Sequence, residues 1–161
     1  MTRSSLLICA LLCACFASTP KSVDASPSAF WSAWSDGAAE VSTYQLTQPR
    51  YGELRSGELQ LIYVTEPFSR SRHVKVDRYQ PDDLDHTIAL KLNIVESWRT
   101  GVYEYRVMTS HFLDARDQLA PLKVTFSSQE WCGITYEESR WTPNALNQTI
   151  RSYFEGESRE E

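Results

Sequence analysis

Apolar and polar residues alternate along most of the chain after its first quarter. The clearest alternation covers residues 88–94, and residues 73–77, 103–107 and 122–127 repeat it. A period of two places every second side chain on the same face, which is typical of a half-buried strand. Residues 59–64 are apolar on both faces, which favours a central strand. The pattern predicts a mainly β protein of about eight strands.

Glycine and proline residues interrupt these runs at the spacing of hairpins. Short turns are predicted at residues 55–58, 66–69, 99–101 and 132–133, and longer loops at 79–86 and 114–121. Short connections join neighbouring strands in an antiparallel, up-and-down order. Long antiparallel strands in this order close into a barrel or curl into a half-barrel, and we expect one of these two forms.

One short helix is predicted before the first strand. Phe30, Trp31 and Trp34 share a face at helical spacing, Pro27 suits a helix start and Gly37 suits a stop. An amphipathic helix with three aromatic side chains most often closes one end of a core. We expect it to cover the open mouth of the curled sheet.

Residues 1–17 have the pattern of a secretory signal, with one basic residue, an apolar run and a small-residue exit. The apolar run is too short to span a bilayer, which needs about 20 residues. Three processing sites remain open. Leu12-Cys13-Ala14-Cys15 resembles a bacterial lipobox with Cys15 as the lipidated residue, and ordinary cleavage would instead fall after Ala17 or Ala25. The signal predicts an exported protein in the periplasm or anchored to the outer membrane.

The domain organisation follows from composition. Residues 18–27 are small and polar, which suits a flexible tether, and residues 28–155 form the predicted single β domain. Residues 156–161 are predicted to be an acidic tail. The chain has 161 residues and a formal net charge of −5 without a basic cluster, which argues against a nucleic-acid partner.

Candidate chemistry is sparse. The three histidines (His73, His86 and His111) form no ligand-spaced pair, and the acidic loop at residues 82–86 lacks the EF-hand glycine and terminal glutamate. No hydrolase, zinc-protease or phosphate-cradling motif occurs. We therefore predict no catalytic residue, no metal site and no cofactor. Cys132 is the one cysteine outside the N-terminal signal, and its apolar neighbours predict a buried thiol.

Aromatic residues are spread over many of the predicted strands. Alternate positions in a curled sheet would bring several of them onto one concave face. They serve either as volume for a β core or as the lining of a pocket for an apolar ligand. The candidate ligand-binding residues nearest the open end of the sheet are Trp31, Trp34, Tyr103, Tyr105 and Trp131.

Three stretches of sequence carry a family resemblance. They are residues 34–46, residues 50–58 and the segment from Leu122 to Gly133, which ends in Gln-Glu-Trp-Cys-Gly. In these stretches the chain resembles an uncharacterised family of bacterial envelope proteins whose members often carry the label "septum formation inhibitor Maf". True Maf nucleotide pyrophosphatases open with a Ser-Pro-Arg-Arg motif, which this chain lacks. The resemblance implies an envelope protein and no catalytic residues, and it leaves open whether the chain is a fragment of a longer protein.

Three functional hypotheses follow. The leading one is a non-enzymatic envelope protein, a lipoprotein, whose curled sheet binds a lipid or other apolar ligand, with a lipid anchor holding it to the membrane. The second is a structural or assembly protein that recruits a partner through an exposed sheet edge. The third is an enzyme that uses Cys132 or the strand face shared by Tyr51, Glu53 and Arg55.

Overall fold

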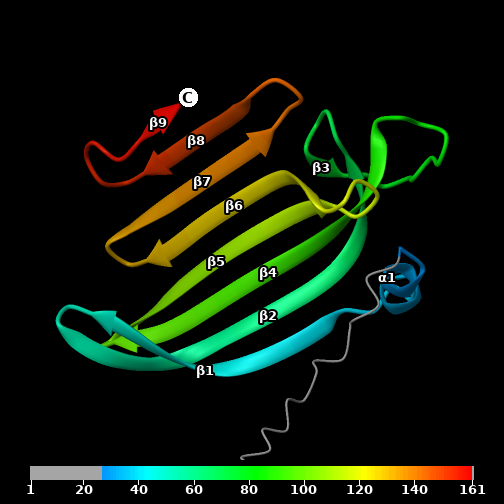
Figure 1. The fold of residues 1–161 in the computed structure, drawn as a ribbon. Coiled ribbons are helices and arrows are strands. Elements are labelled where there is room, and N and C mark those ends of the chain that lie inside the picture. Colours follow the sequence, from blue (N-terminus) through cyan, green and yellow to red (C-terminus); the bar gives the residue numbers. More distant parts are fainter. Residues whose placement is uncertain (1–26, 161) are drawn as a thin grey trace, which may run out of the picture.

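The computed structural model describes residues 27–160, so the predicted signal, the processing sites and most of the tether lie outside the described residues. One helix, α1 (Pro27–Trp34), precedes nine strands that form a single antiparallel sheet (Figure 1). The prediction of a mainly β protein with one short N-terminal helix is confirmed. The strands are β1 (Glu40–Arg50), β2 (Glu53–Ser69), β3 (Val74–Lys75), β4 (His86–Thr100), β5 (Tyr103–Asp114), β6 (Ala120–Glu130), β7 (Gly133–Trp141), β8 (Leu146–Ser152) and β9 (Arg159–Glu160).

Strand order in the sheet is β1-β2-β4-β5-β6-β7-β8-β9, with β3 paired to the end of β2. Apart from β3, each strand pairs with its neighbours in the chain, as the short turns predict. β9 pairs with β8 inside the predicted acidic tail, through Arg159 and Ile150. The sheet is strongly curled and open, because no pairing joins β1 to β9 (Figure 1).

Two of the predicted turns are wrong. Residues 55–58 and 66–69 both lie inside β2, which runs without interruption for 17 residues. The first hairpin turns instead at Tyr51 and Gly52, whose φ angles of 54° and 76° are the left-handed pair of a type I′ turn. Pro67 is tolerated in β2 because β1 begins opposite Tyr63 and does not extend to Pro67. On this edge the Pro67 carbonyl oxygen accepts a hydrogen bond from the Val76 N–H.

Gly57 lies within β2 because a side chain has no room there. A Cβ atom at this position would lie 2.1 Å from the Ser97 carbonyl oxygen and 2.8 Å from Trp98 Cβ. Such a close approach of two strands is a common reason for glycine inside a strand. Gly57 therefore permits β2 to bend tightly against β4 near the first hairpin.

The direction of the curl follows from contacts between distant strands. The side chain of Arg50, at the end of β1, lies 3.8 Å from the carboxylate of Glu130, at the end of β6. Four strand spacings of about 4.8 Å separate these strands in a flat sheet, which is beyond the reach of the two side chains. The face that carries Arg50 and Glu130 is therefore the concave face.

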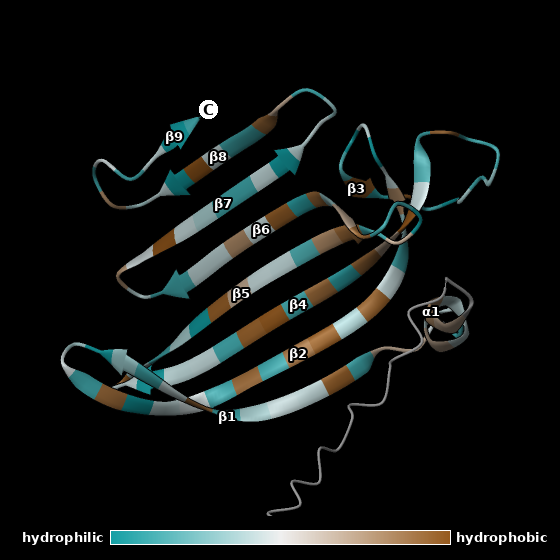
Figure 2. Cartoon of the chain, in the orientation of Figure 1, coloured by the Kyte–Doolittle hydropathy of each residue, from teal (hydrophilic) through white to brown (hydrophobic). Residues whose placement is uncertain are grey.

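The alternation seen in the sequence separates the two faces. Apolar and polar residues alternate along much of β4, and Figure 2 shows bands of both kinds along β2 and β4. Strand register places the predicted apolar stripe of residues 88–94 on the concave face, together with Leu59, Leu61 and Tyr63 of β2. A buried cluster of Phe68, Ala89, Phe112 and Leu122 forms a separate core near the loops at the far ends of these strands.

Candidate functional site

The middle of the concave face is apolar and half-buried. Register aligns Leu61, Ile94, Thr109 and Phe126 in one row across β2, β4, β5 and β6. The next row aligns Tyr63, Leu92, His111 and Val124. All eight of these side chains keep intermediate exposure. A face of this kind offers an apolar surface that a single sheet layer leaves incompletely buried.

Helix α1 lies on this face at the loop end of the sheet. The hydroxyl of Thr65 donates a 2.8 Å hydrogen bond to the carbonyl oxygen of Trp34, whose ring lies 5.9 Å from the ring of Tyr63. The guanidinium of Arg116, in the β5–β6 loop, lies 5.8 Å from the centre of the Trp31 ring. The helix therefore contacts both β2 and the β5–β6 loop.

The opposite end of the concave face is lined by aromatic and charged side chains. We call this group the hairpin-end cluster, and it consists of Arg50, Tyr51, Arg55, Trp98, Thr100, Tyr103, Tyr105 and Glu130. These residues come from the ends of β1, β2, β4, β5 and β6 and from the first hairpin turn. The turns that join these strands gather at the left of Figure 1.

Tyr105 is the centre of the hairpin-end cluster and is only 2% exposed. Its hydroxyl lies 2.8 Å from the hydroxyl of Tyr51 and 3.3 Å from that of Tyr103. The Arg50 guanidinium donates a 3.3 Å hydrogen bond to the same hydroxyl. The Tyr105 ring stacks on Trp98 with the centroids 5.2 Å apart and the planes 5° from parallel. These contacts connect β1, β4 and β5 across the curl.

The tyrosines of this cluster differ in acidity. Burial raises the pKa of Tyr105 far above its usual range, so this hydroxyl stays protonated. The hydrogen bond from Tyr105, followed by one from Tyr103, lowers the pKa of Tyr51. The three hydroxyl groups thus remain hydrogen-bonding groups near neutral pH, and Tyr51 is the one whose negative form is most stabilised.

The hairpin-end cluster also contains buried polar atoms without partners. Five buried side-chain atoms in the described part of the chain lack a hydrogen-bond partner, and all five belong to this cluster. They are Arg50 Nε, Arg55 Nε, Trp98 Nε1, Thr100 Oγ1 and Glu130 Oε2. Such atoms are rare in native proteins, and each one calls for a physical explanation, such as a ligand or an ordered water.

Cys132 is exposed, so the prediction of a buried thiol is wrong. The β6–β7 turn projects the Cys132 side chain and the 77%-exposed Trp131 outward, because a two-residue turn has no neighbouring strand to cover it. The thiol lies 3.6 Å from the Tyr103 hydroxyl, and the Trp131 ring stacks on Tyr103 at 5.4 Å. This turn therefore adjoins the hairpin-end cluster from outside.

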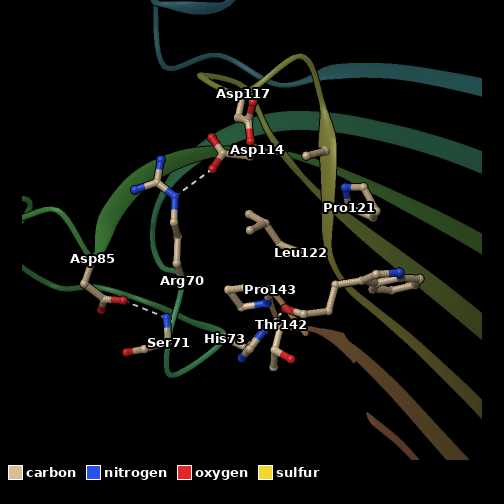
Figure 3. A pocket seen from close by; sticks show the side chains of 12 residues that line it. Arg70, Ser71, His73, Asp85, Asp114, Asp117, Pro121, Leu122, Thr142 and Pro143 are labelled. Carbon is tan, nitrogen blue, oxygen red and sulfur yellow. Dashed lines mark hydrogen bonds and ion pairs between the residues drawn. The ribbon is translucent and has the colours of Figure 1, made fainter. Parts of the chain in front are cut away.

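A hollow of about 520 Å³ lies at the loop end of the sheet (Figure 3). Its apolar wall includes Leu122, Trp141 and Pro143, and its polar wall includes Arg70 and Asp114. A hollow of this size is in the range of small-molecule sites. Its ability to bind a ligand depends on whether its polar groups are free.

The buried polar groups that line this hollow already have hydrogen-bond partners. Asp114 is 2% exposed and accepts hydrogen bonds from Arg70 Nε at 2.9 Å, the Thr87 hydroxyl at 2.6 Å and the Arg116 backbone at 3.0 Å. His73 Nε2 donates a 2.8 Å hydrogen bond to the carbonyl oxygen of Trp141. These bonds connect the β2–β3 and β5–β6 loops to the β7–β8 turn, and we assign them a structural role.

The structure brings together three of the five predicted ligand-binding residues. Tyr103, Tyr105 and Trp131 stack or hydrogen-bond with one another at the hairpin end. Trp31 and Trp34 lie on α1 at the loop end, so the five residues do not form one site. Sequence reasoning missed Arg50, Trp98 and Glu130, and it named Arg55 only on the strand face considered for an enzyme. No local motif marks these residues, because only the register and curl of the sheet bring them together.

Two further observations concern metal-ligating groups and long apolar helices in the described part of the chain. Among residues 27–160, no group of three or more histidine, cysteine, aspartate or glutamate residues has the geometry to hold a metal ion. No described helix is long and apolar enough to cross a membrane.

Comparison of the chain with protein-family models, with curated proteins and with solved structures found no match.

Proposed function

We propose that the protein is a non-enzymatic component of the bacterial cell envelope that binds a lipid or another apolar ligand on the concave face of its sheet. In this proposal the sheet is a half-barrel, with α1 near one end and the hairpin-end cluster at the other. The signal pattern within residues 1–17 exports the protein, and cleavage before Cys15 with lipidation of this residue anchors it to a membrane.

The observation that carries this proposal is the half-exposed apolar surface on the inside of the curl. Leu61, Leu92, Ile94 and Phe126 all face inward yet keep intermediate exposure. Each buried Å² of such surface contributes about 25 cal/mol, so an apolar chain lying along these rows gains several kcal/mol. The core at Phe68 and Phe112, by contrast, is buried and leaves little apolar surface for a ligand.

Binding of a lipophilic fluorescent probe to the purified protein tests this proposal. We choose 1-N-phenylnaphthylamine, whose emission rises when it leaves water. Ile94 and Val95 are adjacent β-branched residues of β4 that face opposite sides of the sheet, which makes them a matched pair. Ile94→Lys should weaken probe binding at least about tenfold, because a charge on the apolar face costs more than 1.4 kcal/mol.

Val95→Lys is the control and should leave probe binding unchanged. Equal weakening by both substitutions, or the absence of saturable binding to the unmodified protein, would overturn the proposal. Native mass spectrometry of protein purified from a bacterial envelope adds a second measurement. It reports whether Cys15 carries acyl chains and whether a lipid stays bound.

A second candidate function rests on the edge of the sheet. β1 is an edge strand of 11 residues that pairs only with β2 among the described strands. A long edge strand can add a strand from another chain by backbone hydrogen bonds. If β1 recruits a second copy, Thr43→Pro should convert a dimer to a monomer in light scattering while Thr43→Val does not. A monomeric unmodified protein would contradict this candidate.

A further inference from the structure

We infer that the ligand of the concave face carries an anionic head group, which binds at the hairpin-end cluster while the apolar part lies along the middle of the sheet. This inference rests on the proposed function and specifies the class of its ligand. The ligand is thus an amphipathic anion, such as a fatty acid or a lipid with a phosphate group.

The unpartnered atoms determine the sign of the head group. Three of the five are N–H donors, from Arg50, Arg55 and Trp98. The Thr100 hydroxyl can also donate, and the single obligatory acceptor is Glu130 Oε2. Carboxylate and phosphate oxygens only accept hydrogen bonds, so an anionic group satisfies these donors, and bonds of this charge-assisted kind are the stronger ones.

The charges of the cluster are balanced before a ligand arrives. Glu130, whose side chain is 8% exposed, lies 3.8 Å from Arg50, and Glu53, whose side chain is 67% exposed, lies 2.6 Å from Arg55. The unpartnered N–H donors, and not a net charge, therefore favour an anionic head group. The head group forms these bonds in competition with the two glutamates.

The head group of the ligand reaches the cluster past the side chains of the first hairpin. The five atoms lie below the surface of the protein, so a head group reaches them when the side chains of Arg50 and Tyr51 move aside. Tyr51 is 65% exposed at the tip of the hairpin. Arg50 is held to Tyr105 by a long hydrogen bond of 3.3 Å and to Glu130 at 3.8 Å. The two polar contacts of Arg50 are long, whereas Tyr51 shares a 2.8 Å hydrogen bond with Tyr105, so the ligand must replace that bond as it enters.

Titration calorimetry of the full chain with three ligands of equal chain length tests the inference. The ligands are dodecanoate, dodecyl phosphate and 1-dodecanol. One or both anions should bind about tenfold or more tightly than the alcohol, because a hydrogen bond to a charged group contributes about 1.5–3 kcal/mol. The tighter anion identifies the head group as a carboxylate or a phosphate.

Two arginines form a matched pair for this test. Arg55 and Arg106 each pair with a glutamate two residues earlier on their own strand, but Arg55 faces the concave side and Arg106 the convex side. Arg55→Gln should weaken anion binding about tenfold and leave dodecanol binding unchanged. Arg106→Gln should change neither. Trp98→Phe keeps the stacked ring, removes the indole N–H and should also weaken the anions selectively.

The outcomes separate this inference from the proposed function. If all three ligands bind equally well, or if Arg55→Gln and Arg106→Gln act alike, the polar atoms hold water and the inference is overturned while apolar binding stands. If none of the three ligands binds, the proposed function itself is overturned. Unfolding curves of each variant ensure that a loss of affinity is read from folded protein.

Discussion

Two buried polar regions lie at opposite ends of the same sheet, and they differ in how their hydrogen bonds are completed. At the loop end, Asp114 accepts three hydrogen bonds and Arg70 donates to Asp114 and to the carbonyl oxygens of Leu84 and His86. At the hairpin end, five buried atoms have no partner. Both regions lie against aromatic rings and strand ends, so neither burial nor composition explains the difference.

The contrast indicates that the two regions have different roles. A completed network of buried polar groups stabilises one conformation, because breaking any bond leaves a costly orphan. An incomplete one lowers stability and is retained where another molecule supplies the missing bonds. We therefore expect substitutions at the loop end to change stability and substitutions at the hairpin end to change binding.

The largest expected effect is on stability, from Asp114→Ala at the loop end. Removal of this carboxylate leaves Arg70 Nε and the buried Thr87 hydroxyl without their acceptor, and we expect a loss of about 3 kcal/mol. Urea unfolding measures the change. Asp117→Ala is the control, because Asp117 lines the same hollow but is exposed. Equal stability of the two variants would contradict the structural role of the loop-end network.

A somewhat smaller effect is expected from Gly57→Ala, which tests the curl itself. The added Cβ would lie 2.1 Å from a backbone oxygen, so β2 and β4 must separate locally. Overpacking of this kind costs about 2 kcal/mol. Because the curl brings Arg50 toward Tyr105, binding of dodecanoate should weaken as well. Ser56→Ala, at the exposed neighbouring position, should change neither property. Retained stability and affinity in Gly57→Ala would show that the bend does not depend on glycine.

The sequence predicts most of the strands, but it does not predict which side chains the folded sheet brings together. Alternation of apolar residues predicts the stripe at residues 88–94, and the glycine at position 101 predicts the β4–β5 turn, because both are local signals. The first turn was missed because Tyr51-Gly52 lacks the Asn-Gly or Asp-Gly signal of a type I′ turn. Gly57 predicts a turn from sequence alone, but it lies inside β2. A glycine that close packing requires in a strand cannot be told from a turn glycine by sequence.

The candidate site could be predicted only in part for the same reason. Tyr103 and Tyr105 were found from their alternation on one strand, which is a local signal. The contact of Arg50 with Glu130 depends on the curl of five strands, and no spacing along the chain encodes it. The exposure of Cys132 was missed because apolar neighbours in sequence do not reveal a side chain at the tip of a hairpin.

Glu130→Gln tests the hairpin end, and we expect it to change the free energy of unfolding only slightly. The Glu130 side chain is 8% exposed, against 3% for Asp114, but its Oε2 atom accepts no hydrogen bond and its nearest cation is 3.8 Å away. Stability should therefore change by less than about 1 kcal/mol. Dodecanoate should bind several-fold more tightly, because a like charge is removed. A loss of stability comparable to that of Asp114→Ala would erase the difference between the two regions.

The smallest expected effect is a pH dependence from Asp85, which lies at the loop end. A 2.5 Å hydrogen bond from the Ser69 hydroxyl, followed by one from the Ser71 backbone, lowers the pKa of this carboxyl below its ordinary value. A carboxyl with a lowered pKa in the folded state stabilises the fold above its ordinary pKa of about 4 and loses this contribution as the pH falls through the folded-state pKa. The thermal midpoint of Asp85→Asn should therefore lie below that of the unmodified protein at pH 7, and the gap should close by about pH 2. The exposed Asp82→Asn serves as the control and should follow the unmodified protein at every pH. A gap that stays constant from pH 7 to pH 2 would mean that the charge of Asp85 contributes nothing to the loop-end network.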